Sequence, residues 1–391
     1  MAIQLGVKHI NNQMEQPPQR HILLFADRLP PLVGGMEMHA GAFIQHFHEH
    51  EVFPLVGVVT RDAEQRDCLL VDDDLLPLSL SDLPSRIGDE PKIVFFNSGR
   101  WIEDLAFLRQ QFPGAKFIYR TGGNEILQAP LVREHIADHT SRQNYWVKQI
   151  AENIDEVITN SVFTDNRLIQ IGMFPDRLFR CVGGVNSSAL TRSRRKSSIS
   201  DSPLVLFCAA RFVPYKNHAL LLKVVSNLIQ AGYKLELRLA GDGPLYSASE
   251  QLAEELGITA HVSFLGRLDN SAVCNELQVA DAYIQFSCDE FTYVPGGHYI
   301  HAEGMGRSIL EAISYGTYVI ALRSGALDEI VTPDRGVVLE KAPPHELAAQ
   351  IASVFARLPD DLPGTNEYEW DFYFQRYEAR WKAMHATVIG N

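Results

Sequence analysis

The sequence lacks the features that mark secreted, membrane-spanning and disulfide-bonded proteins. Its 391 residues include five cysteines, an odd number, and no two of them form a C-x-x-C pair. A disulfide framework is therefore not expected, and a reducing compartment fits better. No window approaches the roughly 18 uninterrupted apolar residues of a membrane span, and the first twenty residues hold no signal-peptide core. We expect a cytoplasmic protein, at most peripheral to the inner face of a membrane.

Positive charge is also scarce. Lysine and arginine number 35 against 48 aspartates and glutamates, and the formal net charge is −13. Because a phosphate backbone is bound chiefly by neutralising cations, nucleic acid is not the expected partner. A polar, serine-rich run at residues 191–203 reads as a flexible surface linker. The alternative is a basic patch on anionic lipid, where each cation could add roughly 1 kcal/mol; its cations are Arg192, Arg194, Arg195 and Lys196.

Two ligand-binding motifs are missing as well. There is no G-x-G-x-x-G fingerprint with a following ribose-binding carboxylate, which disfavours a nicotinamide-dependent dehydrogenase. There is no D-x-D-like carboxylate pair at a suitable strand end, so no metal-held diphosphate is expected.

What the sequence does contain is an alternation of short apolar runs with longer amphipathic stretches, the βαβ pattern of parallel sheets covered by helices. The length favours two domains. Strands are expected at residues 22–26, 55–59, 93–96, 116–119, 156–159 and 178–182. The pattern restarts after the linker, with strands at 204–209, 235–240, 261–265, 282–286 and 317–321 and helices at 218–230, 247–256, 271–279, 307–315 and 344–358. We therefore predict an α/β protein with Rossmann-like domains at 1–190 and 203–365, a linker at 191–202 and a C-terminal helical segment at 366–391.

The segment HAEGMGRSILEAISYG, residues 301–316, is the richest in chemistry. Glu303 precedes a Gly-Met-Gly turn that opens a helix, and Glu311 lies eight positions later. The free N–H groups at such a helix start bind anions, and glycines let a ligand approach the backbone closely. The two carboxylates could take hydroxyl groups on either side of a bound diphosphate. The alternative is a capped helix with a solvated Glu303 and a surface Glu311.

Three further strand ends carry polar or glycine-rich loops, and the carboxyl ends of parallel strands line the ligand crevice. In AARFVPYKN, Arg211 and Lys216 could grip two phosphates, or could simply be exposed cations. AGDGP, residues 240–244, reads alone as a tight turn. FLGR, residues 264–267, could present its backbone to a nucleobase edge.

In this order and spacing, R-x4-K, G-D-G-P, F-x-G and E-G-x-G-x4-E-A-x3-G resemble retaining glycosyltransferase family 4, of GT-B fold. The resemblance covers the second domain and extends forward. Residues 30–40 look like the family's N-terminal glycine loop, 158–164 like its interdomain serine segment, and 181–186 like an altered N-G-V-D segment. The aromatic C-terminal segment fits the family's crossover helix, which packs back on the first domain.

The resemblance implies a role for each matching residue. Arg211 and Lys216 would hold the donor diphosphate and stabilise it as leaving group. Glu303 would contact the donor sugar near the anomeric carbon, and Glu311 the ribose. The remaining donor-binding residues would be Gly34 and Gly35 from the opposite domain, and Gly241, Gly266, Arg267, Gly304, Met305, Gly306 and Arg307.

Two departures from the family pattern stand out. The histidine that many members carry after the strand at 116–119 is absent, so Arg120 or Asn124 would substitute, with Ser161 as a further candidate on the acceptor side. The loop at 287–302 is longer than the usual link and could shape a sugar pocket or act as a lid. His298 and His301, and the His48-Glu49-His50 run, lack the ligand spacing of a metal site and are expected to be solvated.

We therefore expect a retaining, metal-independent glycosyltransferase without a cofactor. It would use a nucleoside-diphosphate sugar, foremost a UDP-linked one, and a hydroxyl acceptor on a glycan, a glycolipid or a small molecule. The alternatives are an inactive sugar-nucleotide-binding protein and an NAD-dependent dehydrogenase. The sequence leaves open the donor base, the sugar and the acceptor.

Overall fold

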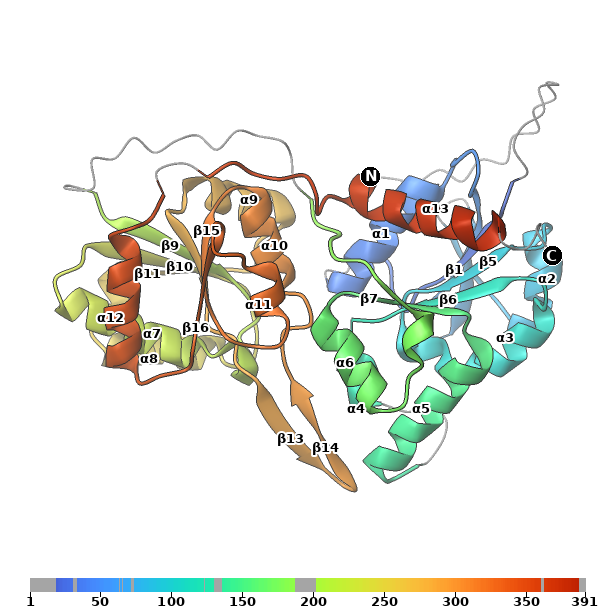
Figure 1. The fold of residues 1–391 in the computed structure, drawn as a ribbon, viewed down its shortest axis with the longest axis horizontal. Helices are drawn as coiled ribbons and strands as arrows, with labels where there is room; N and C mark the ends of the chain where they lie inside the picture. The colour runs from blue at the N-terminus through green and yellow to red at the C-terminus, as the bar shows by residue number, and fades with distance from the viewer. Residues whose placement is uncertain are drawn as a thin grey trace.

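The computed structural model describes residues 19–30, 34–62, 64, 66–71, 74–122, 124–129, 136–186, 202–359 and 362–386. Within them the chain forms two α/β units, each built on its own sheet (Figure 1). Residues 187–201, which hold most of the predicted linker and its four cations, lie outside the described residues. No helix in the described part is long and apolar enough to cross a membrane.

The first sheet has eight strands in the order β4-β3-β2-β1-β5-β6-β7-β8. Its core is parallel, from β2 to β8, whereas β3 and β4 pair antiparallel at one edge. The strands are β1 (Ile22–Phe25), β2 (Leu55–Arg61), β3 (Asp67–Val71), β4 (Asp74–Pro77), β5 (Ile93–Phe96), β6 (Lys116–Arg120), β7 (Glu156–Thr159) and β8 (Leu178–Arg180). The six expected strands are confirmed, and the β3–β4 pair is an addition that the apolar runs did not predict.

Between β1 and β8 the described residues form six α-helices: α1 (Gly35–Phe47), α2 (Leu83–Ile87), α3 (Leu105–Gln111), α4 (Asn124–Gln128), α5 (His139–Asn153) and α6 (Val162–Gln170). The central strands are buried along their whole length, because helices cover both faces of a parallel sheet. This explains why β1 and β5 read as continuous apolar runs rather than as alternating ones.

The second sheet has six parallel strands in the order β11-β10-β9-β12-β15-β16. They are β9 (Leu204–Ala209), β10 (Leu235–Ala240), β11 (Val262–Gly266), β12 (Ala282–Gln285), β15 (Tyr318–Leu322) and β16 (Gly336–Leu339). Its helices are α7 (His218–Gln230), α8 (Tyr246–Glu255), α9 (Asn270–Val279), α10 (Arg307–Ser314), α11 (Leu327–Ile330) and α12 (Pro344–Phe355). The predicted strands and helices of this half are confirmed to within three residues at their ends.

The segment expected to be an irregular loop is instead a two-stranded antiparallel hairpin, β13 (Glu290–Val294) and β14 (Gly297–His301). Its residues are exposed or half-buried, which explains why no apolar run predicted it. The hairpin extends from the second domain to lie beside α5 of the first (Figure 1).

The last helix, α13 (Trp370–Ala386), returns to the first domain, as expected of a crossover helix (Figure 1). Its apolar face enters the core around β1, β2, β5 and α1 with four buried aromatic side chains: Tyr373, Phe374, Tyr377 and Trp381. The chain leading into it is pinned by the N–H groups of Gly184 and Val185, which donate to the carbonyl of Tyr368 at 2.9 and 3.0 Å.

Candidate active site

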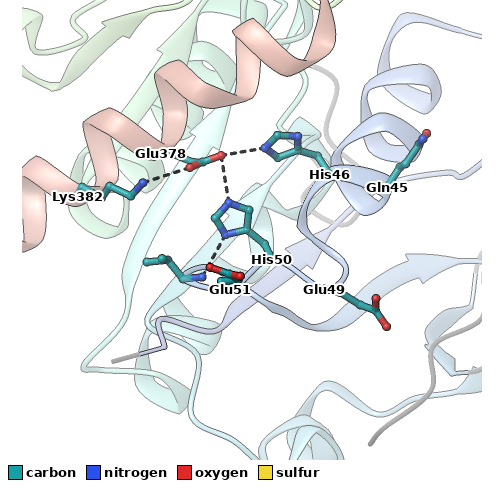
Figure 2. A pocket seen from close by; sticks show the side chains of 8 residues that line it. Gln45, His46, Glu49, His50, Glu51, Glu378 and Lys382 are labelled. Carbon is teal, nitrogen blue, oxygen red and sulfur yellow. Dashed lines mark hydrogen bonds and ion pairs between the residues drawn. The ribbon is translucent and has the colours of Figure 1, made fainter. Parts of the chain in front are cut away.

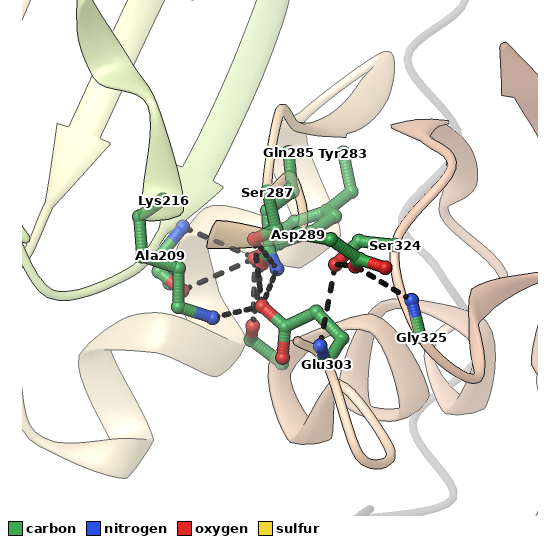
Figure 3. Close-up of polar contacts among 10 residues, drawn as sticks. Ala209, Lys216, Tyr283, Gln285, Ser287, Asp289, Glu303, Ser324 and Gly325 are labelled. Carbon is green, nitrogen blue, oxygen red and sulfur yellow. Dashed lines mark hydrogen bonds and ion pairs between the residues drawn. The ribbon is translucent and has the colours of Figure 1, made fainter. Parts of the chain in front are cut away.

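A buried carboxylate, Glu303, is the centre of the candidate site (Figure 3). The residue is 6% exposed, so the alternative of a solvated Glu303 is wrong. A single oxygen, Oε1, accepts hydrogen bonds from Gln285 Nε2 at 2.8 Å and from Ser287 Oγ at 2.6 Å, and forms an ion pair with Lys216 Nζ. Burying a charge costs free energy unless it is paired, and these donors compensate for that cost.

Lys216 reaches Glu303 from the loop after β9. Asn217, in the left-handed conformation with φ 55°, starts α7 immediately behind it. Burial alone would lower the pKa of Lys216, but the neighbouring Glu303 carboxylate outweighs that effect and raises the pKa. The ammonium therefore stays charged at any physiological pH.

The other cation of this loop, Arg211, is exposed. It adds to the effect of burial in lowering the pKa of His301, which places its charge near the base of the hairpin. Arg211 and Lys216 thus belong to the same loop, but only Lys216 touches Glu303.

A second layer of polar side chains holds Gln285 in place. Tyr283, fully buried in β12, donates to Gln285 Oε1 at 2.7 Å and lies 2.7 Å from Ser308 Oγ. Ser308 also donates to Gln285 Oε1 at 3.1 Å. Because the amide oxygen of Gln285 is occupied, its NH₂ group points towards Glu303 and Ser287. Sequence reasoning missed Tyr283, Gln285 and Ser287; the only signal was their polarity in or just after an apolar strand.

The turn at residues 304–306 opens α10. Gly306 caps the helix with φ 68°, a left-handed conformation that favours glycine. A Cβ on Gly304 would lie 2.7 Å from the carbonyl oxygen of Gly122 in the first domain, so this turn sits directly against the opposite domain. The first N–H groups of a helix have no partner within it, so the start of α10, with Arg307 and Ser308, offers donors to an anion.

Glu311 lies deeper in α10 and is 7% exposed, so the alternative of a surface Glu311 is also wrong. Its Oε1 accepts from Asn270 Nδ2 at 3.5 Å and lies 3.6 Å from Arg307 Nε. Burial raises the pKa of Glu311, and the nearby Arg307 partly opposes that rise. Asn270 is oriented in turn by Asn186, whose Nδ2 donates to Asn270 Oδ1 at 2.9 Å. Sequence reasoning missed Asn270, which had no signal beyond its place at a helix start.

The remaining predicted donor residues of the second domain lie at the ends of β10 and β11. Gly241 has φ 138°, and a Cβ there would lie 2.0 Å from the carbonyl oxygen of Ala210, so only glycine fits. Its N–H donates to the carbonyl of Gly266 at 2.7 Å, which joins the two strand ends. Arg267 follows and is exposed. Met305 is buried in the core beneath α10. No direct contact joins Gly241, Gly266 and Arg267 to Glu303 among the contacts described.

In the first domain, Gly34 caps α1 with an extended backbone and Gly35 begins it. A Cβ on Gly35 would meet nothing within 4 Å, so this backbone faces open space.

The two candidates for the missing histidine, Arg120 and Asn124, and the acceptor-side candidate Ser161 differ in placement. Arg120, at the end of β6, is 9% exposed and donates to Tyr373 Oη at 3.2 Å and to Asn97 Oδ1 at 3.3 Å. Ser161 caps α6 by accepting from the N–H of Thr164 at 3.1 Å, so its hydroxyl has a structural task. Asn124 begins α4, and its side chain is not among those described.

The serine segment is interdomain, as the resemblance implied. The N–H groups of Val162 and Phe163, at the start of α6, each donate to the carboxylate of Glu329 at 2.6 Å. Glu329 belongs to α11 in the second domain. The charge of one domain therefore caps a helix of the other.

Away from Glu303, His46 and His50 meet Glu378 of α13 (Figure 2). Glu378 Oε1 lies 2.9 Å from His46 Nε2 and 3.2 Å from His50 Nε2. His50 Nδ1 accepts from the N–H groups of Val52 and Phe53, so Nε2 carries the hydrogen and donates to Glu378. An Nε2–H has no lone pair for a metal, and the cluster therefore acts as a clamp between α1 and α13. His50 is engaged here, contrary to the expectation that the run at residues 48–50 is solvated.

Comparisons with known proteins agree with this geometry. Residues 191–359 match the model of the family "Glycosyl transferases group 1". Over 343 residues the chain is 26% identical to a GDP-mannose-dependent monoacylated alpha-(1-6)-phosphatidylinositol monomannoside mannosyltransferase of Corynebacterium glutamicum, covering 82% of this chain and 85% of the relative. A related mannosyltransferase of Mycolicibacterium smegmatis is 22% identical, with 86% and 89% covered.

Solved structures share the fold. HepE of Anabaena, in complex with UDP and glucose, superposes with a TM-score of 0.65 at 17% identity, covering 92% of this chain and 99% of that one. Sucrose-phosphate synthase from Thermosynechococcus elongatus gives 0.66 at 17% identity, with 94% and 100% covered. The predicted fold class is thereby confirmed: this is a GT-B fold. The similarities in sequence and fold together support a glycosyltransferase.

Proposed function

We propose that this chain is a retaining glycosyltransferase of family 4 type that transfers a sugar from a nucleoside diphosphate to a hydroxyl group. The observation that carries the proposal is the buried pair of Glu303 and Lys216 beside the open start of α10. An acid, a cation and free backbone N–H groups converge there at the carboxyl edge of a parallel sheet, facing the other domain.

In this proposal the donor diphosphate lies against the start of α10, with Lys216 and the exposed Arg211 on its other side. As the bond from the anomeric carbon to the phosphate oxygen lengthens, negative charge grows on the leaving diphosphate. Fixed cations and helix N–H groups stabilise that charge more in the transition state than in the ground state.

Glu303 holds the donor sugar rather than attacking it. Its Oε1 already accepts three hydrogen bonds, which leaves Oε2 to accept from a sugar hydroxyl. With that carboxylate fixed, the leaving phosphate itself takes the proton of the incoming acceptor hydroxyl, on the face that the phosphate leaves. The configuration at the anomeric carbon is then retained.

Glu311 takes the ribose hydroxyls of the donor, deeper along α10. Asn270 and Arg307 hold its carboxylate. In this proposal the burial of a charged group there serves to bind the ribose. Two cations and a helix start neutralise the diphosphate, so the reaction needs no divalent metal.

For the acceptor we propose a hydroxyl on a glycolipid, reached at a membrane surface and bound by the first domain. The mannosyltransferase relatives act on phosphatidylinositol mannosides, by their names, and support this class. The two comparisons support different donor bases, because the sequence relatives are GDP-mannose-dependent by their names and HepE was solved with UDP.

The experiment is a donor hydrolysis assay without acceptor, run in parallel with GDP-mannose and UDP-glucose. Slow release of one nucleoside diphosphate identifies an enzyme and its base. Calorimetric binding of either donor with no release, in the presence of octyl mannoside as acceptor, would identify an inactive binding protein instead. If octyl mannoside is glycosylated, nuclear magnetic resonance of the new anomeric centre decides between retention and inversion.

A further inference from the structure

The β13–β14 hairpin joins the two domains. It begins five residues after the end of β12 and finishes two residues before Glu303. Its base is tied to the site: the N–H of Cys288 donates to the carbonyl of Tyr215 at 2.8 Å, next to Lys216. Asp289 Oδ1 accepts from Ser324 Oγ at 2.8 Å, and the same Ser324 hydroxyl accepts from the N–H of Glu303 at 3.3 Å (Figure 3).

The tip of the hairpin is seated on the first domain. The carbonyl of Pro295 accepts from the N–H of His139 at 2.9 Å, and the carbonyl of Gly296 accepts from Thr140 Oγ1 at 2.9 Å. His139 is the first residue of α5, so the hairpin satisfies one of the free N–H groups at a helix start. The backbone of the tip can come this close to α5 only because residues 296 and 297 are glycines.

Two glycines make that seat possible. A Cβ on Gly296, which has φ 78°, would lie 1.4 Å from Asp138 Oδ1 and 2.5 Å from its Cγ. Asp138 cannot simply turn away, because its other oxygen caps α5 by accepting from the N–H of Ser141 at 2.7 Å. A Cβ on Gly297 would lie 2.9 Å from His139 Nδ1. The Pro-Gly-Gly sequence of the tip therefore matches the surface that it touches.

The side of the hairpin is held as well. His301, the last residue of β14, lies 2.8 Å from Gln128 Nε2 at the end of α4. The ring centroids of Tyr299 and His139 are 5.9 Å apart. The opposite face of the hairpin carries Phe291 and Tyr293, which are 56% and 81% exposed, so only one face is used for docking.

We propose that this hairpin is an interdomain latch that positions Glu303. Seated on α5 at its tip and tied to the Lys216 and Ser324 loops at its base, it holds the two domains in this relation and fixes the carboxylate at which it ends. Gly296 and Gly297 are positioning residues, since they touch neither the donor nor Glu303. The part that concerns catalysis rests on the proposed function; the mechanical part does not.

A cysteine pair tests the seat. In the double variant His139→Cys, Gly297→Cys the two Cβ atoms would be 3.5 Å apart, within the range of about 3.5–4.5 Å that a disulfide needs. Oxidation should close an intramolecular disulfide, seen on a non-reducing gel and by mass spectrometry, and donor hydrolysis should stay within about twofold of the reduced form. Failure to crosslink would overturn the docking. If oxidation abolished the activity and dithiothreitol restored it, the hairpin would have to leave its seat during turnover, contrary to a latch that positions Glu303 while seated.

A glycine pair tests the consequence. Gly296→Ala should unseat the tip, while Gly257→Ala is the matched control, because Gly257 has a similar φ of 68° but nothing within 4 Å of a built Cβ. Gly296→Ala should enlarge the radius of gyration in X-ray scattering and lower kcat of donor hydrolysis at least tenfold. Its affinity for UDP or GDP should be unchanged, since the proposed ribose and phosphate ligands belong to the second domain.

Equal behaviour of Gly296→Ala and Gly257→Ala in scattering and in hydrolysis would overturn the latch. If the wild type releases no nucleotide at all, the proposed function fails, whereas the disulfide and the scattering still decide whether the hairpin is a latch.

Discussion

Glu303 shows how one side chain can be both buried and available. The three donors around it converge on Oε1, so the second oxygen of the carboxylate is left for a ligand. A buried carboxylate with a single partner would be costly if that partner were removed. Gln285 and Ser287 also donate to the Glu303 carboxylate, so we expect that the Lys216 side chain can be removed without unfolding the protein.

Lys216→Ala is therefore expected to lower kcat/KM for donor hydrolysis by about 100-fold or more, because a charge aimed at the leaving group acts most in the transition state. Steady-state kinetics with varied donor measure it. Lys223→Ala is the control, since Lys223 is an exposed lysine of α7, the helix that begins just after Lys216. An unchanged kcat/KM in Lys216→Ala would remove this residue from the site.

The two carboxylates of the 301–316 segment are expected to separate by ligand. Glu311→Gln should weaken UDP or GDP and the intact sugar nucleotide alike, by about tenfold or more, because a hydrogen bond to a charged group contributes roughly 1.5–3 kcal/mol. Glu303→Gln should leave the bare diphosphate bound as before and should weaken the sugar nucleotide. Calorimetric titration of both variants with both ligands decides, and equal loss of the bare diphosphate in both would refute the division of roles.

At the residue scale, the sequence identified the charged residues of the site but not the neutral residues that bind them. Glu303, Glu311, Lys216 and Arg211 stood out because each is a charged residue near a strand end or a glycine turn. Gln285, Ser287 and Asn270 did not, because a neutral amide or hydroxyl becomes part of a site only through what lies opposite it. Those neighbours are 16 to 41 residues away along the chain.

At the scale of elements, α13 is the clearest case of a helix that stabilises a domain other than the one it follows. Its four buried aromatic residues belong to the core of the first domain, and the Glu378 clamp adds a polar contact at their edge. Burial alone would raise the pKa of Glu378, but the hydrogen bond from His46, the neighbouring His50 and the ammonium group of Lys382 outweigh it and lower the pKa.

A carboxyl group with a lowered pKa stabilises the folded state above its unfolded pKa, near 4.3, and that stabilisation is lost as the pH falls through the folded value. Glu378→Gln should therefore lower the free energy of unfolding at pH 7 by roughly 1.5–3 kcal/mol. The difference from wild type should shrink below about pH 4. Denaturant titrations from pH 7 downwards measure it, with Glu254→Gln, an exposed glutamate of α8, as the control. A difference that is constant over this range would contradict a charged clamp.

The strands that the sequence did not predict are the antiparallel pairs β3–β4 and β13–β14 and the edge strand β16. β4 is exposed and β13 alternates between exposed and half-buried residues, so neither has the apolar run that a parallel strand covered on both faces shows. β3 is different, because Cys68, Leu69 and Leu70 are buried and form an apolar run that the sequence analysis missed. For the hairpin, the Pro-Gly-Gly turn at residues 295–297 was the available signal.

At the scale of the whole molecule, the fold class followed from the alternation of elements, but the contacts between domains did not. Glu329 caps α6, and Gly304 meets the carbonyl of Gly122, across separations of 166 residues and more in the chain. In the sequence, nothing about a glutamate that caps a helix or a glycine in a turn shows whether its partner is local or in another domain. The crossover helix and the serine segment at residues 158–164 were the exceptions, and both were expected from the resemblance to the glycosyltransferase family.

The charge balance of the proposed diphosphate site leads to the last prediction. A nucleoside diphosphate must be neutralised, and the proposed site does so with Arg211, Lys216 and the start of α10 rather than with carboxylates that hold a metal. Donor hydrolysis should therefore stay near its untreated rate in excess EDTA. Arg211→Ala removes one of the cations, and its activity should recover in part when Mg²⁺ is added, whereas the wild type should not respond. Wild-type activity that EDTA abolishes and Mn²⁺ or Mg²⁺ restores would mean that a metal, and not these cations, carries the diphosphate.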